Sequence, residues 1–170
     1  LEYFEEVLKI RLSVYGENHS RVASVYNDIG EIYSVQGDDF KALDYFKKSL
    51  KIVLSVYGEN HSQVSSIYDH IGEIYFAQKD YSKALYYFEE SLKIRLSLFG
   101  ENHPEVALSY YSIGSLYIIQ GDKSKALNYY EKSLKIRLSV YGENHPLTKE
   151  IMDLINVANS KVLQSPETTK

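Results

Sequence analysis

Four histidines are the first residues in this sequence that could bind a metal, because imidazole nitrogen is a common zinc ligand. Each closes a copy of one stretch, KIRLSVYGENH in the first and last copies; they are His19, His61, His103 and His145. The copies recur every 42 residues. Equivalent loops are therefore expected two helix layers, or roughly 16–20 Å, apart. Two nitrogens sharing a zinc ion each lie about 2 Å from it. We predict that these histidines cap helices, and we expect no metal site and no cofactor.

His70 breaks this pattern, because it projects from a predicted helix, and it is the better functional candidate. Other catalytic chemistry finds little support. All nine glycines belong to the repeat, and neither GxxxxGK[ST] nor GxGxxG occurs. The chain has no cysteine, and no Ser–His–Asp set or carboxylate pair stands outside the repeat. We therefore predict that the protein is not an enzyme. The lack of cysteine fits a reducing compartment, and a cytoplasmic location is the expectation.

The charge of the chain argues against two classes of partner. The formal net charge is −4 over 170 residues, so no basic surface for nucleic acid or an anionic membrane is expected. No apolar run approaches the roughly 18 residues of a membrane span. Basic residues do recur on one type of predicted helix, where we expect a solvent-exposed stripe. They are Lys47, Lys48, Lys51, Lys93, Arg95, Lys135 and Arg137.

The 42-residue period organises the predicted helices. A fixed period of this size is typical of repeat arrays, in which each unit buries its apolar face by stacking on its neighbours. Apolar residues three and four apart predict a first helix from about Arg21 to Gln36 and a second from about Phe40 to Tyr57. Equivalent first helices start near 63 and 105, and equivalent second helices near 81 and 124. Turns such as Gly37-Asp38 separate them, with the aspartate as a predicted cap.

This pattern predicts one array over residues 1–163. It consists of a half repeat at 1–19, three full repeats at 20–61, 62–103 and 104–145, and a terminal capping helix at 146–163. Residues 164–170 are predicted to be a disordered tail. Because the chain opens inside a helical pattern, we interpret it as a piece of a longer protein.

Three glycines lie inside predicted first helices, at Gly30, Gly72 and Gly114. A helical glycine costs about 1 kcal/mol relative to alanine, so its recurrence predicts a close approach between paired helices. We expect the small residues of the second helices to face these glycines. They are Ala42, Ala84 and Ala126.

Within each unit the chain resembles the tetratricopeptide repeat. The first-helix signature is found at Tyr26, Ile29, Gly30 and Tyr33 and recurs every 42 residues; the second-helix signature is found at Ala42, Phe46 and Ser49. The resemblance covers about residues 1–160, and the 42-residue length is similar to that of kinesin light chains. It implies an all-α fold, a right-handed α-α superhelical solenoid of helix pairs. It also implies a non-enzymatic protein–protein interaction module, an adaptor or scaffold.

In the resembled family the first helices line a concave groove that holds a peptide. The implied groove residues are Ser24, Asn27, Asp28, Glu31, Ser66, Asp69, His70, Glu73, Leu108, Tyr111, Ser112 and Ser115. They are acidic in the first two units and more apolar in the third, which favours a peptide with a basic and an apolar half. These positions vary between units, which fits either recognition or neutral drift. Two alternatives stay open: self-assembly through exposed solenoid ends, giving a homo-oligomer, and a sensing arm of a larger signalling protein.

Overall fold

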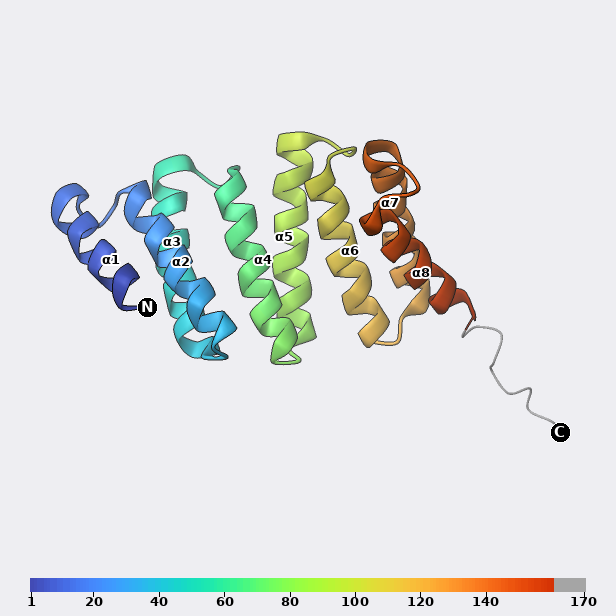
Figure 1. Ribbon diagram of the computed structural model, residues 1–170, viewed down its shortest axis with the longest axis horizontal. Coiled ribbons are helices and arrows are strands. Elements are labelled where there is room, and N and C mark those ends of the chain that lie inside the picture. The colour runs from blue at the N-terminus through green and yellow to red at the C-terminus, as the bar shows by residue number, and fades with distance from the viewer. Residues whose placement is uncertain (161–170) are drawn as a thin grey trace. The chain divides into compact units, whose positions relative to one another are not determined.

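The computed structural model describes residues 1–160, and these residues form eight α-helices (Figure 1). The helices are α1 (Glu2–Tyr15), α2 (Ser20–Val35), α3 (Asp39–Tyr57), α4 (Ser62–Ala77), α5 (Tyr81–Phe99), α6 (Pro104–Ile119), α7 (Lys123–Tyr141) and α8 (Pro146–Ser160). The all-α prediction is confirmed, and α2 and α3 begin and end within one residue of their predicted bounds. The predicted tail at 164–170 and the predicted end of the last helix lie outside the described residues.

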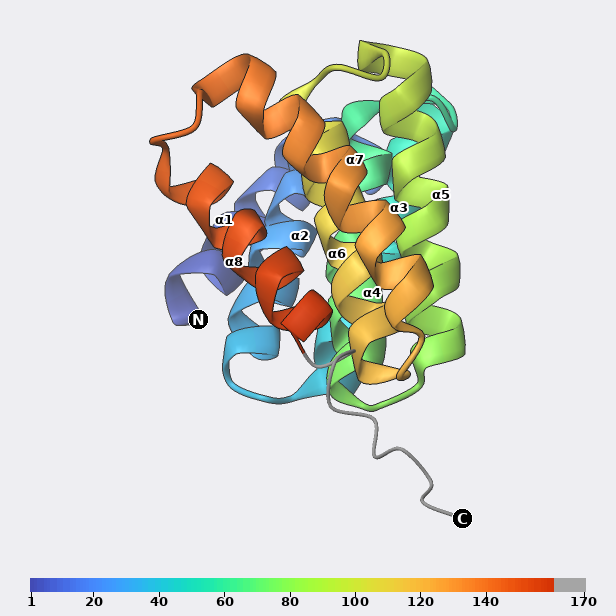
Figure 2. The same cartoon turned by 90° about the vertical axis from the view of Figure 1, so that its right-hand side faces the viewer.

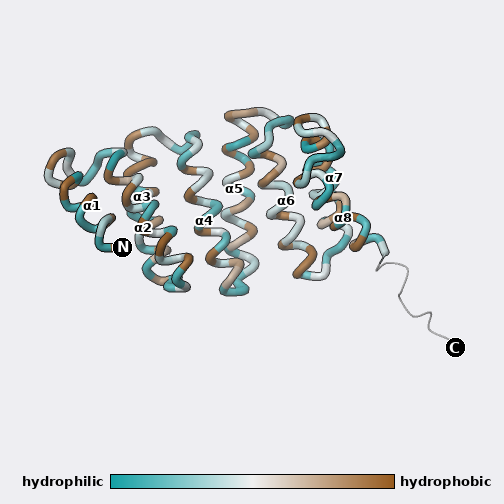
Figure 3. The backbone as a smooth tube through the Cα atoms, in the orientation of Figure 1, coloured by the Kyte–Doolittle hydropathy of each residue, from teal (hydrophilic) through white to brown (hydrophobic). Residues whose placement is uncertain are grey.

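The chain folds into two compact units, Leu1–Leu98 and a second that begins at Phe99. Within each unit the chain reverses direction at every loop, so that successive helices are antiparallel (Figure 1). In the second unit, α6 and α7 lie side by side and α8 folds back along α7, as the rotated view also shows (Figure 2). Apolar residues recur along each helix (Figure 3). The helices α2 to α8 each have buried residues, whereas α1 packs only partly buried apolar side chains, such as Leu8, against the core.

The GENH loops end one helix and start the next. The Nδ1 atom of His61 accepts a hydrogen bond from the backbone N–H of Gln63, at 3.2 Å, at the start of α4. Its ring stacks on Tyr57, the last residue of α3, with 4.2 Å between ring centroids. His19, His103 and His145 make the same two contacts in their loops. The prediction that these histidines cap helices is confirmed.

Each helix pair is closed by an aromatic ring that covers the helical glycine. Phe46 of α3 is fully buried, and a Cβ atom added to Gly30 would lie 2.8 Å from its Cε1 atom. Phe88 covers Gly72, and Tyr130 covers Gly114, in the same way. The expected alanine is close at Gly114, where the Ala126 carbonyl oxygen would lie 3.3 Å from the added Cβ atom, but at all three glycines the ring four residues further along the second helix is nearer. The alanine at each position is still fully buried.

Two further contacts join first and second helices. A buried serine hydroxyl of the second helix donates to a first-helix carbonyl, from Ser49 to Ala23 at 2.8 Å and from Ser133 to Ala107 at 2.7 Å. One second-helix tyrosine also packs against two first-helix tyrosines. These triplets are Tyr45 with Tyr26 and Tyr33, Tyr87 with Tyr68 and Tyr75, and Tyr129 with Tyr110 and Tyr117. Together these contacts hold the paired helices in one register. The register decides which first-helix side chains stay exposed and can contact a partner.

Candidate functional site

In the first unit, predicted groove residues of α2 and α4 form one polar cluster. The Oε1 atom of Glu31 accepts a 2.6 Å hydrogen bond from Nδ2 of Asn27, one turn earlier on α2. The same oxygen lies 3.3 Å from Nε2 of His70 on α4. The Nδ1 atom of His70 lies 3.9 Å from a carboxylate oxygen of Glu73. We call the surface that carries these residues the α2/α4 face; it also includes Ser24, Asp28 and Ser66.

His70 is held in place from behind. Its ring stacks on the ring of Phe46, with 5.0 Å between centroids and 7° between planes. Phe46 is itself fully buried against Gly30. The stacking therefore holds the imidazole between the carboxylates of Glu31 and Glu73. Stacking on Phe46 does not by itself require carboxylates at these two positions. Among residues 1–160, no group of three or more histidine, cysteine or carboxylate side chains is placed to hold a metal ion.

Acidic side chains on this face differ in how far they are available. Glu31 and Glu73 are exposed, and Asp28 is half-buried. Burial raises the pKa of Asp28, the Glu31 carboxylate raises it further, and the Arg11 guanidinium opposes both effects. A cationic partner would relieve the repulsion between Asp28 and Glu31.

Asp69 has an internal partner. Its carboxylate lies 2.7 Å from Nη2 of Arg95, a side chain that is only about 4% exposed. Burial raises the pKa of Asp69 to about 6, while the Arg95 guanidinium and the Ser91 hydroxyl lower it. The predicted solvent-exposed basic stripe was therefore wrong for Arg95. It was wrong for Arg137 too, which is equally buried. The long apolar stems of arginine allow this burial once the guanidinium is paired.

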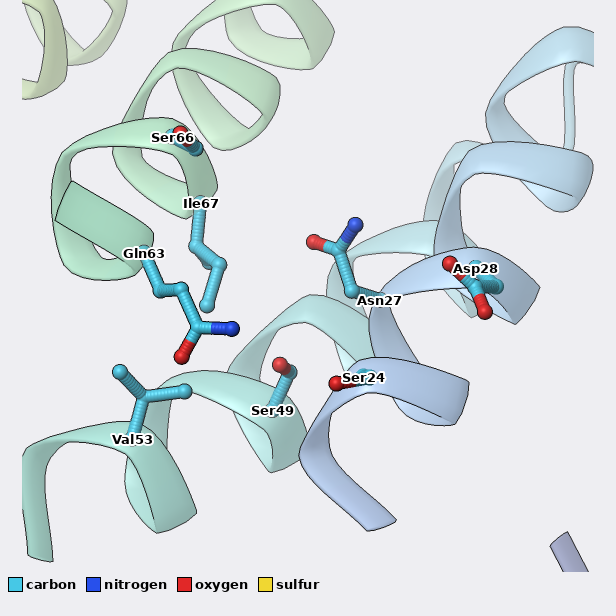
Figure 4. Close-up of a pocket in the computed structure, with 8 residues that line it drawn as sticks. All are labelled: Ser24, Asn27, Asp28, Ser49, Val53, Gln63, Ser66 and Ile67. Carbon is cyan, nitrogen blue, oxygen red and sulfur yellow. The ribbon is translucent and has the colours of Figure 1, made fainter. Parts of the chain in front are cut away.

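A cavity of about 210 Å³ lies beside the cluster, between α2, α3 and α4 (Figure 4). It is lined by Ser24, Asn27, Asp28, Ser49, Val53, Gln63, Ser66 and Ile67. The close-up shows the amide groups of Asn27 and Gln63 turned into the space between α2 and α4. The predicted groove residues do not include Ser49, Val53, Gln63 and Ile67. The signal that could have found them is Val53 itself, since the other copies of the motif have arginine there.

Predicted residues of the second unit form a separate set, in which Tyr111 and Ser115 are already hydrogen-bonded. The Tyr111 hydroxyl donates to Glu150 at 3.1 Å, and the Arg137 guanidinium lies 5.0 Å from the Tyr111 ring centroid. Ser115 donates to the Tyr111 carbonyl and accepts from the Tyr130 hydroxyl. Leu108 is exposed and Ser112 is half-buried. This set offers mainly apolar and aromatic surface.

Comparison with known families decides what kind of repeat this is. The family model described as tetratricopeptide repeat matches residues 1–53, 21–97 and 63–139. The chain belongs to the tetratricopeptide repeat family. The resemblance inferred from the signature residues is thus confirmed. Tetratricopeptide repeats are typically protein–protein interaction modules and are generally non-catalytic. Within residues 1–160, no helix has the length and apolar character needed to cross a membrane.

Solved structures with the same fold include kinesin-light-chain-like repeats. BtubC (BKLC) from P. vanneervenii is 19% identical with a TM-score of 0.78, over 99% of this chain and 75% of that one. A second structure contains TPR-like repeats of a kinesin light chain candidate from Podosopora anserina, which are nearly identical to one another. This chain is 15% identical to it with a TM-score of 0.72, over 96% of this chain and 87% of that one. The N-terminal domain of STI-1 from C. elegans is 17% identical with a TM-score of 0.62, over 82% and 96%. No curated protein sequence matches the chain.

Proposed function

We propose that this tetratricopeptide repeat protein is a non-enzymatic adaptor or scaffold whose α2/α4 face binds a basic segment of a partner protein. The observation that carries the proposal is the pair of carboxylates, Glu31 and Glu73, on either side of His70, with Asp28 in the lining of the neighbouring cavity. Like charges gathered at one surface favour a partner of opposite charge. A protein without cysteines suits the cytoplasm, where we expect it to act.

The second unit would contribute apolar contacts. Leu108 is exposed on α6, and Tyr111, three residues later on the same helix, is half-buried. We propose that an apolar or aromatic segment of the partner binds these side chains. This contact is additional to the basic segment on the α2/α4 face.

A displayed peptide library tests the proposal. The test variant carries Asp28→Lys, Glu31→Lys and Glu73→Lys, and leaves Asp69 unchanged because reversing its charge would oppose the buried Arg95. The control variant reverses three exposed acids elsewhere in the same unit; they are Asp44, Glu59 and Glu89. We expect the native protein and the control to enrich basic peptides and the test variant to lose them. Equal enrichment by all three proteins, or none by any, would contradict the proposal.

Self-association is a second candidate, favoured by the apolar side chains that α1 exposes. Tyr3, Ile10 and Val14 are all more than half exposed. A patch of this kind is typical of interaction surfaces. Light scattering over a range of protein concentrations would detect an oligomer, and an Ile10→Glu, Val14→Lys variant should return it to a monomer. A constant monomeric mass for the native protein excludes this candidate.

A further inference from the structure

The cavity on the α2/α4 face coincides with a substitution in the repeated motif. The KIxL stretch has arginine in three copies, at Arg11, Arg95 and Arg137, but valine at Val53. Val53 is about 1% exposed and lines the cavity. The contacts that the three arginine side chains make therefore indicate which chemical group is missing beside Val53.

Each arginine reaches between helices. The Nη1 atom of Arg137 donates to the Leu147 carbonyl at 2.6 Å and lies 3.5 Å from Glu150, both on α8, while its guanidinium lies over Tyr111 of α6. In the first unit Arg11 donates from Nη1 to the Arg21 carbonyl at 2.7 Å. Arg95 pairs with Asp69 of α4. The guanidinium groups of Arg95 and Arg137 thus lie beside the first helix of their own pair, and those of Arg11 and Arg137 bond the start of the first helix that follows.

The positions that surround these arginines surround the cavity at Val53. Tyr111 and Asp69 each precede their arginine by 26 residues, and the residue 26 before Val53 is Asn27. Leu147 and Glu150 follow Arg137 by 10 and 13 residues, which corresponds to Gln63 and Ser66. All three counterparts line the cavity. The cavity is therefore the space that a guanidinium fills elsewhere in the same repeat.

Two acceptor atoms of the lining have no hydrogen-bond partner. The Nδ2 atom of Asn27 is bound to Glu31, which leaves Oδ1 as the free end of the amide. Over residues 1–160, this oxygen and Oε1 of Gln63 are buried side-chain atoms without a hydrogen-bond partner. A buried, unpaired acceptor is costly and favours any donor that can reach it. The remaining lining residues are uncharged except for Asp28, which is acidic. The exposed Ser66 lies at the rim, so the cavity can be reached from solvent.

We propose that this cavity binds an arginine side chain of the partner peptide, whose guanidinium takes the place that Arg95 and Arg137 occupy in their own helix pairs. The inference rests on the proposed function and names the residue that the basic segment must contain. A guanidinium is planar and has five N–H donors, which matches several separate acceptors; a lysine ammonium is a compact point charge with three. Arginine is therefore expected to be preferred over lysine at this position.

Titration of the native protein with three short peptides tests the proposal. The probes are acetyl-Ala-Arg-Ala-amide and the same peptide with lysine or with citrulline, which keeps the planar shape but lacks the charge. Side-chain amide NMR signals of Asn27 and Gln63 report occupancy, and that of Asn60, which is bonded to Ser97 outside the cavity, is the reference. We expect saturable shifts of the first two signals with the arginine peptide and at least tenfold weaker binding of the others. No shift, or equal affinity for all three, overturns the proposal.

A pair of variants separates this inference from the proposed function. Val53→Arg should fill the cavity from inside and reduce affinity for the arginine peptide at least tenfold. Val56→Arg makes the same change on the same helix at a residue that is 44% exposed, and should bind as the native protein does. If library-selected basic peptides bind Val53→Arg unchanged, the arginine site is wrong although the proposed function stands. If Val53→Arg does not fold, the titration of the native protein still decides.

Discussion

Gly30→Ala is expected to destabilise the protein although alanine is the better helix former. A Cβ atom at this position would lie 2.8 Å from Cε1, 2.9 Å from Cδ1 and 3.1 Å from Cζ of Phe46. The ring cannot retreat into solvent, because Phe46 is fully buried. His70 stacks on it, so a shift of the ring would also displace the imidazole from Glu31.

Two opposing effects set the size of the change. Replacing a helical glycine by alanine contributes about 1 kcal/mol of stability through backbone entropy and helix propensity. Overpacking a buried contact typically costs about 1–3 kcal/mol. The expected net result is a loss of about 1 kcal/mol, within a range of about 0–2 kcal/mol. Urea denaturation followed by circular dichroism measures the free energy of unfolding on this scale.

A double-variant cycle isolates the contact with the ring. In a Phe46→Val background the side chain lacks the Cδ1, Cε1 and Cζ atoms that the added Cβ atom would meet, so Gly30→Ala should stabilise by up to about 1 kcal/mol. The sign of the alanine effect should therefore reverse between the two backgrounds. The packing argument is refuted if Gly30→Ala stabilises the native background by the full helix-propensity increment, or if its effect is the same in both.

Three further predictions concern the ends and the interior of the helices. Arg137→Met should lower the free energy of unfolding by about 2–4 kcal/mol, because it removes a buried charge-assisted bond to Leu147, and hydrogen exchange should show α8 opening first. Asp69 has a folded-state pKa of about 6, above its usual 3.8, so its contribution to stability declines as pH rises from about 4 to 6. Asp69→Asn should remove this pH dependence. If the free energies of unfolding of the variant and the native protein differ by the same amount across these pH values, the prediction is contradicted. His61→Ala should cost about 0.5–2 kcal/mol by removing the cap on the Gln63 N–H, and His61→Asn should recover part of the loss, as melting curves would show.

Local features of this fold were predictable because they depend on neighbours in sequence. The GENH stretch contains both the glycine that follows one helix and the histidine that caps the next: Gly58 has a positive φ after α3, and His61 caps α4 as predicted. Asp38 likewise caps α3 by accepting from the backbone N–H of Lys41. Helix bounds followed from the spacing of apolar residues, since burial of one face is the main requirement on an amphipathic helix.

Features that depend on the distance between helices were predicted less well. The alanine and the aromatic residue are both buried on the same second helix, and only the packed structure shows that the atoms nearest to a Cβ added at Gly30 belong to Phe46. Arg95 was placed in solvent because charged residues seldom lie in a core; its burial depends on Asp69, which is on another helix. The cavity had a visible sequence signal in Val53, but its meaning required the surroundings of the other arginines.

The most direct test of the peptide-binding proposal is backbone amide NMR of the native protein with the most enriched basic peptide from the library. We expect the largest chemical-shift changes on α2 and α4, around Asn27, Glu31, His70 and Glu73, and we expect them to be lost with the Asp28→Lys, Glu31→Lys, Glu73→Lys variant. Changes confined to other helices, or binding that survives the charge reversal, would contradict the proposal that the α2/α4 face is the binding site.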